Sequence, residues 1–140
     1  MKVIIGKPPG KSGQKQKVKV RLHEHDTWNM DQTLAYIIGP MLEQLKSTSH
    51  GAPHVDPEDV PASLRPRNSC KITGMDERHF DRWNWILDEM IFSFNAKTDD
   101  TFENQFFTGD GYDSAAQEKH QERVNNGFRL FGKYYESLWD

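Results

Sequence analysis

The sequence has little cysteine and no long apolar run, and both absences restrict what the protein can be. The single cysteine, Cys70, cannot form an intramolecular disulfide, and no N-terminal run resembles a signal peptide. No segment approaches the roughly 20 consecutive apolar residues that cross a bilayer as a helix. We therefore expect a soluble protein of a reducing cytoplasm, with no membrane partner.

An excess of charge of either sign is also missing. The 140 residues include 18 Lys and Arg and 21 Asp and Glu, which gives a formal net charge of −3 at pH 7. Nonspecific nucleic-acid binding depends on a strong cationic field, so nucleic acid is not the expected partner. The hydrophobic content is only 35%, but it includes 8 Phe, 4 Trp and 4 Tyr. Their large side chains can build the core of one domain from few positions.

Two short N-terminal segments have the composition of strands. Val3–Ile5 is apolar throughout, and in Val18–Leu22 the apolar residues alternate with charged ones, as they do along a strand with one polar face. Pro8, Pro9 and Gly10 lie between the two segments and cannot continue either strand. The sequence therefore predicts an antiparallel hairpin.

Three longer segments have the apolar spacing of helices. The first runs over about residues 30–46 behind a cap at Asn29 or Thr27, and its Gly39-Pro40 pair predicts a kink or break. The second runs over 76–97, is capped by Asp76, and has the wide apolar arc of a central helix. The third begins at residue 114 with a capping box, and its apolar stripe continues to residue 138.

These segments predict a single domain over residues 1–140 of the α+β class, in which a small antiparallel β-hairpin or sheet packs on three main helices. Residues 47–74 are rich in proline and have no periodic pattern, so we expect a long surface loop there.

Two motifs that resemble ligand-binding loops are rejected on their spacing. Gly6–Ser12 has three residues between its glycines where a phosphate loop has four, and a strand follows it instead of a helix. Asp56–Asp59 lacks the ligand spacing of a calcium loop. Its carboxylates are expected to cap turns or to pair with Arg65 and Arg67.

A metal site is a further alternative. His23 and His25 project to one face of a strand end, because side chains alternate with period two. Together with Asp26 and His50 they would supply the ligands of a catalytic zinc or manganese ion. The rest of a metallohydrolase pattern is absent, and exposed histidines at strand ends are commoner than ligands. No metal and no cofactor are therefore expected.

Aromatic and basic residues suggest a binding site for a small nucleotide. Trp and Tyr rings stack on bases, Arg and Lys hold phosphates, and His and Asp donate or accept hydrogen bonds. The alternative is that the basic residues pair with acidic neighbours on adjacent turns. The predicted ligand-binding residues are Arg21, Asp26, Trp28, Asp31, His50, Trp85, Arg129, Lys133 and Tyr134.

Four strings of sequence are long and specific. DTWNMDQTLAYI (26–37), HGAPHVDPEDVP (50–61), RWNWILDEMI (82–91) and NGFRLFGKYY (126–135) resemble a family of small uncharacterised proteins in tailed-phage genomes, including phages of marine cyanobacteria. The resemblance covers about residues 17–140. It implies that residues 1–16 are a variable hairpin arm and that the protein is virus-encoded and acts in the cytoplasm of a bacterial host.

Three functions follow as hypotheses. The first is a binding protein, not an enzyme, that sequesters a nucleotide signal of host antiviral defence and forms a homo-oligomer. The second is a protein-binding module, either an inhibitor of a host enzyme or a virion or assembly component, with Trp139, Phe102, Phe106 and Phe107 as contact residues. The third is a metal-dependent hydrolase at His23, His25, Asp26 and His50.

Overall fold

The structure is a computed structural model that describes residues 1–7, 10, 13–66, 76–109 and 111–139. The chain divides into two compact units, Met1–Leu34 and Ala35–Asp140, and each is described by itself. Three main helices and two small antiparallel sheets place the fold in the predicted α+β class. Among the described residues, no helix combines the length and the apolar composition that crossing a bilayer requires.

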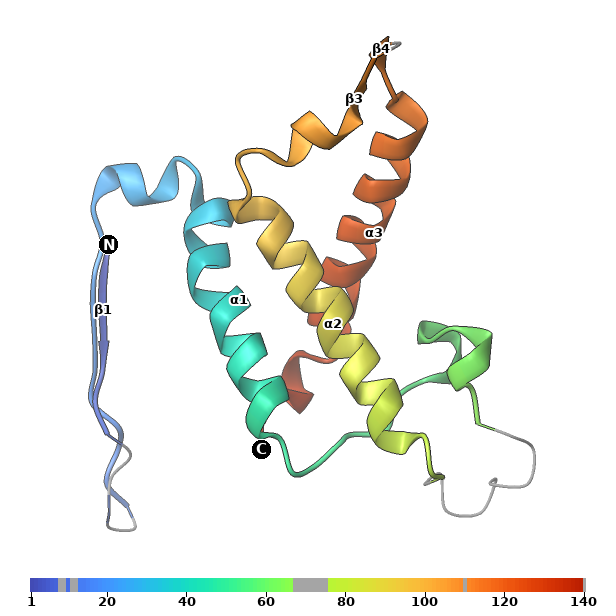
Figure 1. The fold of residues 1–140 in the computed structure, drawn as a ribbon. Coiled ribbons are helices and arrows are strands. Elements are labelled where there is room, and N and C mark those ends of the chain that lie inside the picture. The colour runs from blue at the N-terminus through green and yellow to red at the C-terminus, as the bar shows by residue number, and fades with distance from the viewer. Residues whose placement is uncertain (8–9, 11–12, 67–75, 110, 140) are drawn as a thin grey trace. The chain divides into compact units, whose positions relative to one another are not determined.

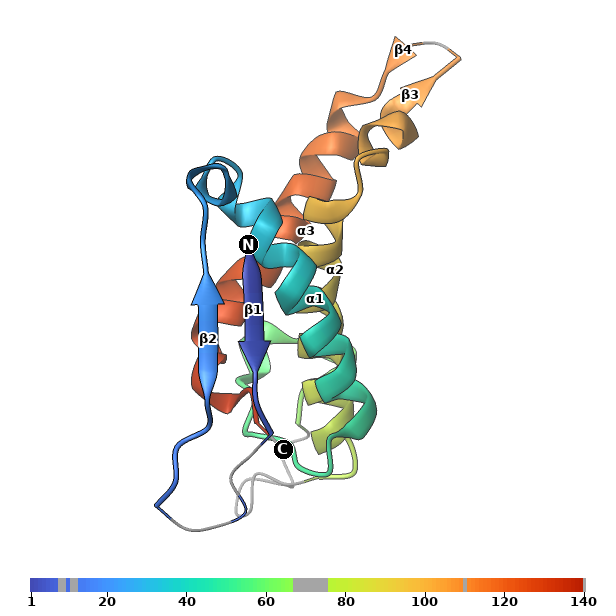
Figure 2. The ribbon, with the colours of Figure 1, turned by 90° about the vertical axis from the view of Figure 1, so that its left-hand side faces the viewer.

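The first unit contains a two-stranded ribbon, which confirms the predicted hairpin. Strand β1 (Lys2–Ile5) pairs antiparallel with β2 (Val18–Arg21), and the two lie side by side in Figure 2. Part of their connection, including most of the rejected Gly6–Ser12 motif, lies outside the described residues. A 3-10 helix, η1 (Glu24–Thr27), follows β2.

The register of this ribbon separates two kinds of side chain. Lys2 lies opposite Arg21 and Ile4 opposite Lys19, whereas the intervening pairs consist only of valine and isoleucine. Because side chains alternate across a strand, one face of the ribbon is cationic and the other is apolar. We call Lys2, Lys19 and Arg21 the cationic ribbon face. The apolar ribbon face consists of Val3, Ile5, Val18 and Val20.

The helices differ from prediction at their ends and at one proline. Helix α1 (Met30–Thr48) continues through Pro40, so the expected break does not occur. The preceding Gly39 is buried, and a Cβ atom there would lie 2.9 Å from the Asn95 side chain of α2 (His79–Thr98). Packing of the second unit thus outweighs the local cost of the proline. Helix α2 begins at His79 with Arg78 at its N-cap, so the predicted cap at Asp76 is wrong.

Helix α3 (Ser114–Lys133) is capped by Asp113, whose carboxylate accepts a hydrogen bond from the backbone N–H of Ala116 at 2.9 Å. The expected capping box at Ser114 is therefore replaced by a cap one residue earlier. The helix ends at Lys133, and a short 3-10 turn, η6 (Tyr135–Ser137), carries the last part of the predicted stripe.

A second small hairpin between α2 and α3 was not predicted. The 3-10 helix η5 (Phe102–Phe106) leads into strand β3 (Phe107–Thr108), which pairs with β4 (Gly111–Tyr112). Gly111 has a φ of 132°, a region that favours glycine. Each strand has only two residues, too few for a periodic pattern in the sequence.

The core of the second unit lies where α2 packs on its neighbours, and Figure 1 shows α2 between α1 and α3. Trp83, Ile86, Leu87 and Met90 of α2 are almost completely buried. The segment between α1 and α2, predicted as a surface loop, also contributes: it contains η2 (Pro57–Asp59) and η3 (Ala62–Leu64) and buries Val55, Asp59 and Val60. The remaining core positions are Ala35, Leu42, Phe94, Leu130 and Tyr134.

Gly127 allows α3 to approach α2 closely. A Cβ atom on Gly127 would lie 1.9 Å from Ser93 Oγ and 2.3 Å from the carbonyl oxygen of Glu89, so helix α2 would have to move. We expect Gly127→Ala to lower the free energy of unfolding by about 2 kcal/mol or more, because overpacking a helix contact costs this much. Urea denaturation of the purified variant measures the loss.

Gly132→Ala is the matched control on the same helix. A Cβ atom at Gly132 meets nothing within 4 Å, and alanine is the better helix former by up to about 1 kcal/mol. This variant should be as stable as the wild type or more stable. Equal stability of the two variants would contradict the close approach at Gly127.

Candidate functional site

The structure gathers only part of the predicted nucleotide site. Arg21, Asp26, Trp28 and Asp31 belong to the first unit, and the other five predicted residues belong to the second. Within the second unit, His50 is exposed and Trp85 is half-buried against the core. The three residues that do come together are Arg129, Lys133 and Tyr134.

These three residues surround the carboxylate of Asp59, which is only 7% exposed. The Arg129 guanidinium lies 2.8 Å from Asp59 Oδ1, and Lys133 Nζ lies 2.6 Å from Asp59 Oδ2. The Tyr134 hydroxyl donates to the same Oδ2 at 2.7 Å and accepts a bond from the backbone N–H of Asp56 at 3.0 Å. We call this group the Asp59 cluster.

The ionisation of the Asp59 cluster follows from these contacts. Burial opposes the charge of Asp59, but hydrogen bonds from Lys133, Tyr134 and Arg129 outweigh it and hold the pKa of this carboxyl below its usual range. Burial, together with the Asp59 carboxylate, raises the pKa of Tyr134 to about 12. Hydrogen bonds to Asp56 and Asp59 also raise the pKa of Lys133. At neutral pH Asp59 is therefore ionised, Lys133 is protonated and Tyr134 is neutral.

The Asp59 cluster connects the segment after α1 to helix α3. Arg129 and Lys133 pair with carboxylates, which is the alternative to a nucleotide site. Their acidic partners, however, come from a distant segment and not from adjacent turns. Asp59 pairs with Arg129 and Lys133, and Asp56 with Lys133, instead of the expected Arg65 and Arg67; Arg67 lies outside the described residues. Phosphate binding by Arg129 or Lys133 would have to compete with these ion pairs.

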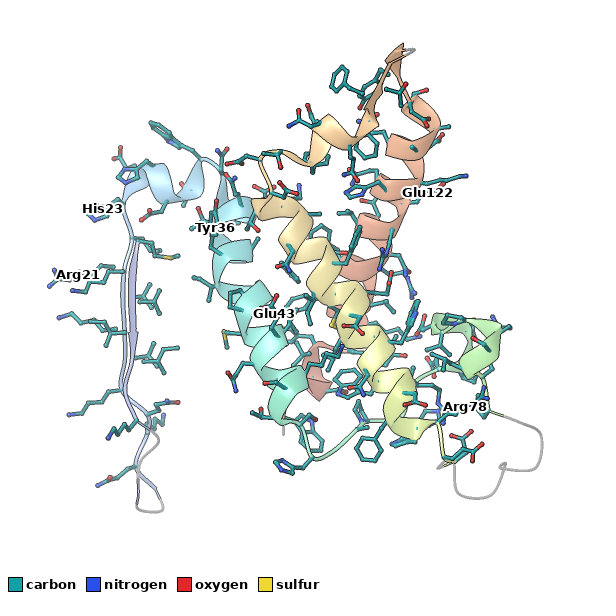
Figure 3. All side chains as sticks on the ribbon, viewed as in Figure 1. Arg21, His23, Tyr36, Glu43, Arg78 and Glu122 are labelled. Atoms are coloured by element: carbon teal, nitrogen blue, oxygen red, sulfur yellow. The ribbon has the colours of Figure 1, made fainter. Side chains whose placement is uncertain are left out.

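The first unit presents its functional groups differently. Arg21, Lys2 and Lys19 are exposed and, with Ile4, line a shallow depression of about 120 Å³. Arg21 and His23 project to the same side of the chain in Figure 3. The backbone of His23 is extended, with φ −118° and ψ 158°, so the side-chain alternation of β2 continues to this residue.

Three aromatic side chains, from His23, His25 and Trp28, follow strand β2 in the sequence. The rings of His23 and His25 stack with centroids 5.5 Å apart, and Trp28 approaches His25 edge-on at 6.4 Å. Trp28 is 80% exposed, and we call these three residues the His–Trp cluster. A chain of exposed cationic and aromatic side chains therefore runs from Lys19 to Trp28 within one unit.

Asp26 holds the backbone of this segment. Its Oδ2 accepts a hydrogen bond from the His23 backbone N–H at 2.7 Å, and its Oδ1 lies 2.6 Å from the amino group of Met1. The hydrogen bond from that amino group, followed by the one from His23, holds the pKa of Asp26 below its usual range. Asp26 therefore positions the His–Trp cluster, while Asp31 at the start of α1 is exposed.

The distribution of charge along the sequence indicates this surface, but the net charge of the whole chain conceals it. Residues 1–22 contain seven of the 18 basic residues and none of the 21 acidic ones, so residues 23–140 carry 11 basic and 21 acidic side chains. The net charge of −3 is the sum of a strongly cationic segment and a strongly anionic remainder. Counting charge by segment would have indicated the ribbon.

The metal alternative has no support in the geometry. In the part of the chain that the structure describes, no three His, Cys, Asp or Glu residues are placed to hold a metal ion. His23 and His25 stack with nearly parallel rings, and Asp26 is committed to Met1 and His23. Cys70 lies outside the described residues.

The four aromatic residues predicted as contacts of a protein-binding module differ in their exposure. Trp139 and Phe107 are exposed, at 63% and 65%. Phe106 is buried, and Phe102 is half-buried, stacked on the His120 ring. The last two therefore belong to a packed aromatic cluster and not to a contact surface.

Replacing Asp59 tests the Asp59 cluster. Asp59→Asn removes the buried charge, takes from Arg129 its carboxylate partner and leaves Lys133 with Asp56, so we expect the free energy of unfolding to fall by about 2 to 3 kcal/mol. Asp56→Asn is the matched control, because Asp56 is more exposed and its ion pair with Lys133 lies nearer to water; it should cost less than about 1 kcal/mol. Chemical denaturation of both variants gives the comparison, and equal losses would contradict the central place of Asp59.

The same variant predicts a change in pH dependence. The pKa of Asp59 is lower in the folded protein than the ordinary 3.8. Its stabilisation is therefore complete above pH 3.8 and is lost as the pH falls through the lowered value. The stability difference between wild type and Asp59→Asn should be constant near neutral pH and shrink below pH 3.8. Denaturation midpoints over this range measure it, and a difference that grows on acidification would contradict the assignment.

Comparisons with protein-family models, curated proteins and solved structures found no match to this chain. The resemblance to tailed-phage proteins therefore stays a prediction from the four strings of sequence. Its functional implications depend on the chain's own residues, and the cationic ribbon face and the His–Trp cluster are exposed groups with a chemistry suited to a ligand.

Proposed function

We propose that this chain is a binding protein without catalytic activity, and that residues 1–34 bind a ligand built from nucleotides. One observation carries the proposal: a strand with an exposed cationic face continues directly into an exposed histidine and tryptophan cluster. Phosphate and base, the two parts of a nucleotide, are the groups that such side chains bind.

The cationic ribbon face supplies the phosphate contacts. Lys19 and Arg21 are two residues apart on β2, so their side chains leave the same face about 7 Å apart. Lys2 lies opposite Arg21 on the neighbouring strand. Arginine can donate two parallel hydrogen bonds to one phosphate, and lysine adds a compact charge beside it. In contrast to Arg129 and Lys133, these three cations stand on an exposed ribbon.

The His–Trp cluster supplies the surface for a base. An indole that is 80% exposed leaves much of its apolar ring in water, and stacking on a base removes part of that ring from water. The T-shaped contact with His25 supports the ring and still leaves it largely exposed. Arg21 and Trp28, two of the nine predicted residues, therefore remain in the proposed site, while Arg129, Lys133 and Tyr134 have a structural role.

The proposal keeps the biological setting implied by the resemblance. A phage protein in the cytoplasm of a bacterial host can oppose a nucleotide-based defence by binding alone. The sequestered nucleotide immune signal and the homo-oligomer of the sequence analysis are parts of this proposal. No cofactor is needed for such a function.

Charge removal on the ribbon tests the proposal. We expect Arg21→Gln to weaken binding of nucleotide ligands at least tenfold, because a charge-assisted phosphate contact contributes about 1.5 to 3 kcal/mol. Lys119→Gln on α3 is the matched control: it removes one exposed positive charge from the second unit and should leave binding unchanged. Isothermal titration calorimetry with a panel of mono-, di- and oligonucleotides measures both. Equal weakening by the two substitutions would contradict the proposed site.

A protein-binding module is the second candidate, and the apolar ribbon face favours it. Its four valine and isoleucine side chains are 39% to 59% exposed, and exposed apolar patches of this kind mark contact surfaces. Val20→Thr with Val18→Thr keeps residues suited to a strand and makes this face more polar. Loss of a defined complex with a host or phage protein in this variant, with nucleotide binding unchanged, would support this candidate.

A further inference from the structure

We infer that the ligand of the first unit is a single strand of nucleic acid, held along the ribbon by its phosphates and stacked on Trp28 by one of its bases. The inference rests on the proposed function, that residues 1–34 bind a ligand built from nucleotides, and it puts a polymer in the place of the small nucleotide signal. It differs from the expectation drawn from net charge, because that expectation averaged the cationic ribbon with the anionic remainder of the chain.

The cationic row is longer than a mononucleotide needs. The pairing of the ribbon continues past the ends of its strands, since the Gly6 N–H donates to the Lys17 carbonyl at 2.8 Å. Lys17 therefore joins Lys19 and Arg21 on one face, and the extended backbone at His23 continues the alternation. The three cations span about 13 Å, and His23 extends the row on this face to about 20 Å, a length suited to several consecutive phosphates.

The shape of the surface also favours a polymer. The depression lined by Lys2, Ile4, Lys19 and Arg21 has a volume of about 120 Å³, below the roughly 300 Å³ at which pockets enclose a small ligand. A free nucleotide on this open face would stay largely in water. A strand gains from each phosphate that it places beside a cation, since every such contact releases a condensed counterion.

Charge segregation confines the strand to the ribbon. Residues 1–22 have seven basic and no acidic side chains, and the remaining residues have ten more acidic than basic side chains. A polyanion is therefore attracted by the first segment and repelled by the remainder. Exposed Trp28 selects an unpaired strand over a duplex, because the bases of a duplex are already stacked on each other.

The test uses the full chain and a fluorescently labelled oligothymidine of about 12 nucleotides, a typical site size for such surfaces. Anisotropy titrations at several salt concentrations compare wild type with Lys19→Gln/Arg21→Gln, Trp28→Ala and the control Lys119→Gln. We expect the wild type to bind with a logarithmic salt slope of roughly −2 to −3, as three or four phosphate contacts imply.

The variants separate the two kinds of contact. The double glutamine variant should lose at least tenfold in affinity and about half of the salt slope, since Lys2 and Lys17 remain. Trp28→Ala should lose severalfold with an unchanged salt slope, because stacking releases no counterions. Lys119→Gln should bind as the wild type does. Circular dichroism and denaturation midpoints equal to those of the wild type show that each variant is folded.

Three outcomes would overturn the inference, and they can be told apart. In the first, thymidine monophosphate or another free nucleotide binds as tightly as the oligonucleotide, with an equal loss of affinity in the Arg21 variant. In that case the proposed function holds, and the inference that the ligand is a polymer is wrong. If a duplex of the same length binds as tightly and Trp28→Ala leaves the affinity unchanged, the inference that the ligand is single-stranded is wrong. If neither nucleotides nor oligonucleotides bind at low salt, both the inference and the proposed function fail.

Discussion

The buried carboxylate of Asp59 is the contact on which the arrangement of the second unit depends. It takes bonds from three side chains at the end of α3 and thereby holds the segment after α1 against that helix. Val55 and Val60, on either side of it in sequence, are buried in the core. Tyr134, which donates to Asp59, also makes a T-shaped contact with Trp83 near the start of α2. One ionised group thus links a segment with little regular structure to two helices.

This contact also determines which cationic side chains are available to bind a ligand. An arginine and a lysine on one helix face suit a phosphate site, and the sequence predicts such a site at Arg129 and Lys133. In the structure the negative charge is already supplied by Asp59 and Asp56. A second anion would have to displace a buried carboxylate, which costs several kcal/mol when its partners are lost. The exposed cations of the ribbon carry no comparable penalty, so an anionic ligand would bind there at a lower cost.

Local patterns in the sequence predicted the elements, and long-range contacts decided what the elements do. The alternation in Val18–Leu22 and the helical spacing of three segments are local, so the hairpin and the helices could be predicted. Pairing of Asp59 with Tyr134 spans 75 residues, and no pattern near either residue indicates it. The continuity of α1 at Pro40 likewise depends on packing of Gly39 against α2. The cationic ribbon could have been found, since it required only that charge be counted by segment.

Different interactions therefore determine the stability of the second unit and the binding properties of the ribbon in the first. The second unit is held by buried apolar side chains and by ion pairs that are satisfied internally, such as that of buried Arg82 with Asp76, and salt screens such pairs weakly. The ribbon presents its charges to water, where salt screens them strongly. Ionic strength should then change binding by the ribbon well before it changes the stability of the helices. A ligand that binds through the ribbon will thus be released by salt from a protein that is still folded.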